Sequence, residues 1–139
     1  MAPTKQGQLL IYQKYVDLIN YSYNLLQKFP KAEKYAMVAH VKDSMFTALK
    51  VILQANKIYH NQAARIDRLN TLDAEVQLQK VLVRLAHQNR YISNSNYMEW
   101  SRRLDEIGRL LGGWIRQTVG KADGNFIPIA HWDRSNWPS

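Results

Sequence analysis

Residues 107–116 read IGRLLGGWIR and place three glycines inside a segment with the pattern of a strong amphipathic helix. Each glycine costs a helix about 1 kcal/mol relative to alanine, so another interaction must offset that cost. At about 100° per residue, one face of this helix gathers Leu104, Ile107, Leu111, Trp114, Ile115 and Thr118. Gly108 and Gly112 lie together on the flank of that face, where missing side chains allow a second helix to approach closely. The pattern therefore predicts helix packing within the chain or between copies around Gly108, Gly112, Gly113 and Trp114. The alternatives are that the glycines are merely tolerated, or that Gly112 and Gly113 mark an earlier helix end.

The composition predicts one all-α domain. The chain has 139 residues, 46% of them hydrophobic, and no proline between Pro30 and Pro128, which favours long helices. It contains no cysteine and therefore no disulfide or zinc–thiolate site. No apolar run approaches the roughly 20 residues of a membrane span, and the opening segment lacks the apolar run of a signal peptide. We therefore expect a cytoplasmic protein.

Apolar periodicity predicts four helices, at about residues 8–28, 31–58, 65–89 and 96–120. Phe29-Pro30 and the polar stretches 59–65 and 89–97 separate them. Long helices with short connections predict an antiparallel up-down-up-down four-helix bundle over residues 1–120. Residues 121–139 lose the helical period but keep several aromatic residues. We expect this tail to dock along a bundle, its own or a neighbour's; the alternative is a frayed terminus.

The third predicted helix has two apolar sectors. One contains Leu69, Leu72, Val76 and Val83, and the other contains Leu78, Val81, Leu82 and Leu85. A helix that is apolar on two sides is normally buried on two sides. We therefore expect another subunit to cover the second sector, unless a single wide core face includes both.

No pattern of catalytic or metal-binding residues stands out. The histidines at 40, 60, 87 and 131 lack a second ligand at helical spacing. The chain has neither a nucleophile elbow nor a phosphate-binding glycine loop, because GRLLGG lies within a helix with no strand before it. We expect no catalytic residue, no cofactor and no metal, and hence no enzyme.

The most informative feature of the sequence is its excess of positive charge. The net charge is +8 and the isoelectric point is about 9.8, which favours a polyanionic or acidic partner. Arg102, Arg109 and Arg116 are spaced by seven and form a row along one helix face. The residues expected to bind nucleic acid or another partner are Arg65, Arg68, Lys80, Arg84, Arg102, Arg103, Arg109 and Arg116, with further positive charge from Lys28, Lys31, Lys34 and Arg90. Arginine rows can hold a phosphate backbone without reading bases. The alternative is a solvated face balanced by local ion pairs.

Two motifs together resemble a known superfamily. KFPKAEKYAM (28–37) and LDEIGRLLGGWIR (104–116) are similar to segments of small four-helix-bundle proteins. These include the ribosomal-RNA intervening-sequence proteins and the accessory variability determinant (Avd) of diversity-generating retroelements. The intervening-sequence branch usually carries a segment like SIPANIAEG in its second helix, where this chain reads MFTALKVILQANKIYH (45–60). That departure, the tryptophan after the glycines and the many arginines look more like the retroelement protein over about residues 8–120.

The resemblance implies a homopentameric barrel of bundles. Such a protein would bind the reverse transcriptase of the retroelement and nucleic acid, either template RNA or cDNA, and support mutagenic retrohoming without being an enzyme. The tail falls outside the part that resembles the family. The alternative function is a structural or protein-interaction bundle of the intervening-sequence type.

Overall fold

The computed structural model describes residues 5–121, which form four α-helices and one short 3₁₀ turn. The helices are α1 (Lys5–Leu26), α2 (Met37–Asn56), α3 (Gln62–Gln88) and α4 (Asn94–Lys121), and the 3₁₀ turn is η1 (Lys31–Glu33). No strand occurs within these residues. The prediction of an all-α four-helix fold is confirmed. The predicted tail at 121–139 lies outside the described residues except for its first residue, Lys121.

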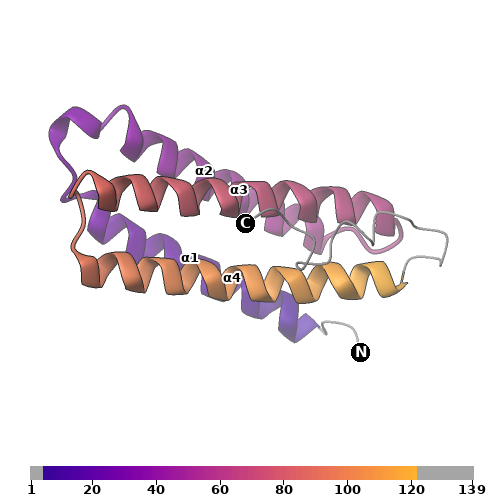
Figure 1. Cartoon of the computed structure of the whole chain (residues 1–139). Helices are drawn as coiled ribbons and strands as arrows, with labels where there is room; N and C mark the ends of the chain where they lie inside the picture. The colour runs from indigo at the N-terminus through magenta and orange to yellow at the C-terminus, as the bar shows by residue number, and fades with distance from the viewer. Residues whose placement is uncertain (1–4, 122–139) are drawn as a thin grey trace.

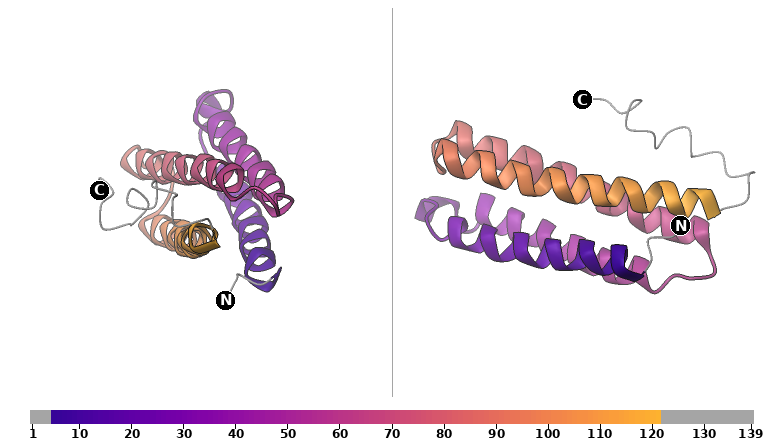
Figure 2. Two further views of the ribbon diagram at one scale, coloured as in Figure 1. Left: turned by 90° about the vertical axis from the view of Figure 1, so that its right-hand side faces the viewer. Right: turned by 90° about the horizontal axis from the view of Figure 1, so that it is seen from below.

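The connections alternate between the two ends of the bundle, so consecutive helices run in opposite directions (Figure 1). Figure 1 shows α2 beside α3 and α1 beside α4, and the right-hand view of Figure 2 separates α1 and α2 from α3 and α4. Each helix therefore packs against two neighbours: α2 contacts α3, α3 contacts α4, α4 contacts α1, and α1 contacts α2. This is the up-down-up-down arrangement that the short connections predicted. Each of the four helices lacks the apolar stretch that a membrane span requires.

The second helix begins later than predicted, at Met37 instead of residue 31. Pro30 precedes the turn η1, and Ala36 has a non-helical backbone with φ −116° and ψ −102°, which separates η1 from α2. Glu33 Oε1 accepts a hydrogen bond from Met37 N at 3.2 Å, and Glu33 Oε2 accepts one from Tyr91 Oη at 2.8 Å. The Glu33 carboxylate thus caps α2 and ties the α1–α2 connection to the α3–α4 connection.

Side-chain caps account for two other boundaries. Helix α3 begins at Gln62 instead of residue 65 because the Asn61 side chain accepts a hydrogen bond from Ala64 N at 3.0 Å. Helix α4 begins at Asn94 instead of 96, where Ser93 Oγ accepts from Asn96 N at 3.0 Å. Both corrections lengthen the predicted helix at its N-terminus.

A chain of polar side chains crosses the apolar core and joins three helices. Tyr15 of α1 donates to Gln79 Oε1 of α3 at 2.9 Å, and Gln79 Nε2 donates to Ser44 Oγ of α2 at 3.0 Å. Ser44 in turn donates to Glu75 Oε1 at 2.7 Å. Burial raises the pKa of the Tyr15 phenol, which stays neutral and acts as a donor. Because buried polar groups must find partners, this network favours one register of α1, α2 and α3.

Only one of the two apolar sectors of α3 enters the core. Leu69, Leu72, Val76 and Val83 are at most 1% exposed. In the second sector, Leu78, Val81 and Leu85 are 44%, 48% and 38% exposed, and Leu82 is half-buried. The interpretation as one wide core face is therefore wrong. The expectation of a second subunit over this sector stays a prediction.

Helix α4 continues through its three glycines, so the interpretation of Gly112 and Gly113 as an earlier helix end is wrong. Gly108 and Gly112 are buried, and Trp114 is only 2% exposed. Gly113 is half-buried, and a Cβ added there would lie 3.9 Å from Arg116 Nη2, its nearest described neighbour. Gly113 therefore has room for a methyl group, and no described helix requires a glycine at that position.

Candidate nucleic-acid interface

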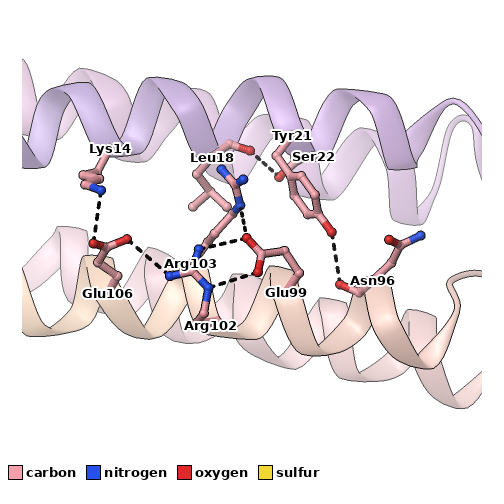
Figure 3. A network of polar contacts seen from close by, with 9 residues as sticks. All are labelled: Lys14, Leu18, Tyr21, Ser22, Asn96, Glu99, Arg102, Arg103 and Glu106. Atoms are coloured by element: carbon pink, nitrogen blue, oxygen red, sulfur yellow. Dashed lines mark hydrogen bonds and ion pairs between the residues drawn. The ribbon is translucent and has the colours of Figure 1, made fainter.

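The first two arginines of α4 are held by a carboxylate on their own helix (Figure 3). Glu99 accepts Arg102 Nε at 3.0 Å and Arg102 Nη2 at 2.8 Å, and it also accepts Arg103 Nε at 2.7 Å. The hydrogen bonds from Arg102 and then from Arg103 lower the pKa of Glu99 to about 2. The charge of one guanidinium is thereby compensated at this end of the predicted row.

Arg103 also connects α4 to α1. Its guanidinium carbon lies 4.4 Å from the centroid of the Tyr21 ring, a cation–π distance. Beside it, Tyr21 Oη donates to Asn96 O at 3.4 Å, and Lys14 Nζ of α1 lies 3.3 Å from Glu106 Oε2 (Figure 3). Arg103 therefore belongs to a polar seam between α4 and α1, whereas Arg102 pairs with Glu99 and Glu106 of its own helix.

Arg109 and Arg116 differ from these two residues. Both are exposed, and neither forms an ion pair with any residue in the described range 5–121. Their Cα atoms are seven residues apart, about 10 Å along the helix axis. The predicted arginine row is therefore divided into a compensated N-terminal half and a C-terminal half whose guanidinium groups are free for an anion.

Three of the four predicted basic residues of α3 lie at least partly on the surface, in three different environments. Lys80 Nζ lies 3.0 Å from Asp105 Oδ1 of α4, so this residue links two helices. Arg68 Nη2 lies 3.2 Å from Asp67 Oδ2, and Arg68 Nη1 donates to Gln54 Oε1 at 3.4 Å. Arg84 is exposed and forms no ion pair within the part of the chain that the structure describes. Of these three predicted residues, Arg84 most resembles Arg109 and Arg116.

Arg65 is not on the surface, and its inclusion among the exposed binding residues needs correction. It is 5% exposed, its Nε donates to Ala55 O of α2 at 3.2 Å, and its guanidinium carbon lies 5.9 Å from the Trp114 ring centroid. Tyr59 lies at 6.0 Å on the connection between α2 and α3. Burial lowers the pKa of Arg65. The side chain joins α2, α3 and α4 and cannot reach a phosphate without leaving the core.

The geometry thus reduces the predicted set to three exposed, uncompensated guanidinium groups: Arg84, Arg109 and Arg116. Each presents a planar fork of donors that matches phosphate or carboxylate oxygens. One signal for the division was available in the sequence, because Glu99 precedes Arg102 and Arg103 by three and four residues, the spacing of helical ion pairs. The burial of Arg65 had no such local signal.

The histidines and carboxylates between residues 5 and 121 do not gather into a metal site. No group of three His, Cys, Asp or Glu side chains in this range could hold a metal ion. His87 stacks on Tyr97 with ring centroids 4.2 Å apart, and its Nε2 lies 3.0 Å from Asn94 Oδ1. These contacts hold His87, in the last turn of α3, against the first turn of α4.

Comparison with known proteins agrees with this architecture. None of the curated proteins compared with the chain matches it. A family model described as bAvd-like matches residues 9–118, which is nearly all of the four-helix bundle. Families of this kind are accessory and non-catalytic, and the four helices fit an Avd-like protein. On this match, the chain belongs to the bAvd-like family.

Proposed function

We propose that this chain is the accessory protein of a diversity-generating retroelement. It binds the reverse transcriptase of the element and nucleic acid, either template RNA or cDNA, and supports mutagenic retrohoming without catalysing a reaction. Membership of the bAvd-like family supports the general role. The observation that carries nucleic-acid binding is the exposed pair Arg109 and Arg116, which lacks carboxylate partners among the described residues. In a chain of net charge +8, such a pair favours a polyanion.

The proposed assembly is a homopentamer, and the second apolar sector of α3 supports contacts between subunits. Leu78, Val81 and Leu85 lie within seven residues of one another and are exposed in the single chain. Contiguous apolar side chains on a surface commonly mark a protein contact.

The test compares two double variants that remove the same charge from the same helix. Arg109→Ala/Arg116→Ala removes the uncompensated guanidinium groups, and Arg102→Ala/Arg103→Ala removes those held by Glu99. Binding of a labelled RNA is measured by fluorescence anisotropy between about 50 and 200 mM salt. Each lost phosphate contact should reduce the slope of log affinity against log salt by about 0.7–0.9. We expect a reduction of about 1.4–1.8 for the first variant and a much smaller one for the second.

The outcome of these measurements decides between the possible functions. Wild-type binding that does not respond to salt would contradict a phosphate-contacting surface. Equal loss in both variants would mean that net charge matters and that the position of Arg109 and Arg116 does not. Capture of the retroelement polymerase by the wild-type protein tests the second half of the proposal. If the protein binds RNA but never captures the polymerase, its role in retrohoming is wrong and a generic bundle function is favoured.

A further inference from the structure

A cavity of about 250 Å³ opens at the end of the bundle where α1 is followed by η1 and α2. Its apolar lining includes the buried side chains of Leu26, Phe29 and Val38. Lysines at positions 31, 34 and 42 also line it. The lining therefore combines apolar side chains with a few cationic ones, the composition common to sites for small organic ligands.

The lysines around this cavity are not compensated. Lys31, Lys34 and Lys42 form no ion pair with any other residue between 5 and 121. The neighbouring carboxylate of Glu33 is occupied by Met37 N and Tyr91 Oη. Val38 lies in the first turn of α2, so the positive end of that helix dipole is at the cavity as well.

Aromatic rings lie beside these charges. Tyr23 lines the cavity, and Lys42 Nζ lies 4.6 Å from its ring centroid. The Phe46 ring, 48% exposed, is 6.3 Å from that of Tyr23. Outside the cavity, Tyr35 is 86% exposed, with Lys34 Nζ 5.5 Å from its ring centroid. Lysines beside aromatic rings, two of them exposed at Tyr35 and Phe46, are typical of surfaces that bind single-stranded nucleic acid through stacking and charge.

We propose that this cavity binds one unpaired nucleotide of a single-stranded nucleic acid. The base enters the apolar cavity against Tyr23, and Lys31 and Lys34 contact the adjacent phosphates. An acidic peptide would satisfy the lysines but would leave the apolar interior without a flat partner. A base within a duplex is stacked and paired and cannot enter. The inference rests on the proposed nucleic-acid binding and adds a second site to it.

This site is separate from the arginines of α4. The hydrogen bond from Tyr91 to Glu33 places the α3–α4 connection at the cavity end of the bundle. Helix α4 begins there at Asn94, and Arg116 follows 22 residues later, about 33 Å along the axis. A strand that occupied both sites would have to extend along the length of the bundle. The two sites can therefore be removed independently.

The experiment compares Lys31→Ala/Lys34→Ala with Lys50→Ala/Lys57→Ala. All four lysines are exposed, the two variants lose the same charge, and Lys50 and Lys57 do not line the cavity. The probes are a single-stranded oligouridylate of about 12 nucleotides, containing one 4-thiouridine, and a duplex of the same length. Binding is followed by anisotropy, and photo-crosslinks are mapped by mass spectrometry. Circular dichroism verifies that each variant is folded.

We expect Lys31→Ala/Lys34→Ala to weaken single-strand binding about 25-fold near 0.1 M salt and to reduce the salt slope by about 1.4. The duplex should respond much less, the control variant should match wild type, and crosslinks should map to residues 23–42. Equal behaviour of the two lysine variants, or the absence of crosslinks within that segment, would overturn the cavity site.

The arginine variant separates this outcome from failure of the proposed function. If Arg109→Ala/Arg116→Ala weakens binding and Lys31→Ala/Lys34→Ala does not, the proposed function stands and the cavity site is wrong. If only the lysine variant weakens binding, the cavity site stands and the α4 surface is wrong. Wild-type protein that binds neither probe at low salt overturns both.

Discussion

Replacing Arg65 with alanine distinguishes a structural arginine from one that binds nucleic acid. The substitution removes the hydrogen bond from Arg65 Nε to Ala55 O at 3.2 Å and leaves that carbonyl in a buried position. It also removes the cation–π contacts with Trp114 and Tyr59, at 5.9 and 6.0 Å. Three helices meet at this side chain, so its loss should weaken the whole fold.

The expected destabilisation is about 2–3 kcal/mol. A hydrogen bond from a charged group contributes about 1.5–3 kcal/mol. The ring distances are near the outer limit of the cation–π range, so these contacts add roughly 0.5 kcal/mol each. Relief of the cost of burying a guanidinium offsets part of this sum. The result is a large fraction of the roughly 5–15 kcal/mol that stabilises a typical domain.

Urea unfolding followed by circular dichroism at 222 nm measures this change, at one protein concentration because assembly would alter the apparent stability. Arg84→Ala is the matched control, an exposed arginine on the same helix, and should change the free energy of unfolding by less than about 0.5 kcal/mol. Arg65→Lys keeps a charge and a donor and should recover part of the loss. The RNA salt slope of Arg65→Ala should equal that of wild type. An Arg65→Ala protein of wild-type stability with a reduced salt slope would refute the structural assignment.

Two further predictions concern the acid response and the assembly. The pKa of Glu99 is lowered from 4.5 to about 2 by its arginine partners, so its contribution to stability is present above about pH 4.5 and disappears as the pH falls toward 2. Glu99→Gln should therefore reduce the loss of stability between those pH values; acid titrations of wild type and variant that run in parallel would contradict this. Val81→Asp/Leu85→Asp places charges in the exposed apolar sector of α3 and should shift the protein toward smaller species in native mass spectrometry while its helical content stays unchanged. Thr47→Asp/Lys50→Asp, at exposed positions of α2, is the control, and an unchanged subunit count in the α3 variant would remove this sector from the interface.

Much of the architecture was predictable from the sequence because helix formation depends on local periodicity. The apolar period of 3.6 residues predicted four helices, and the short polar connections predicted their alternating directions. The boundary errors occurred where side chains act across a turn, as Glu33 does for Met37 and Asn61 for Ala64. The motifs at 28–37 and 104–116 resembled the family whose model matches residues 9–118.

The candidate site was less predictable, because the partners and the burial of a charged side chain depend on residues far away in the chain. Helical spacing predicted that Arg102, Arg109 and Arg116 share a face. The same rule, applied to positions three and four residues apart, also predicts the ion pairs of Glu99. It could not show that Lys80 meets Asp105, 25 residues later, or that Lys42 lies over Tyr23. These pairs exist only because different helices are packed side by side.

The sequence alone therefore determined the helices, their order, their apolar stripes and the excess of positive charge, since each depends on residue type and near neighbours. Tertiary structure alone decided how those features are used. It buried Arg65 against Trp114, left Leu78, Val81 and Leu85 of α3 exposed, and formed an open cavity lined by residues of α1, η1 and α2. The physical reason is that helical periodicity defines which residues share a face, whereas packing of distant helices decides what that face meets.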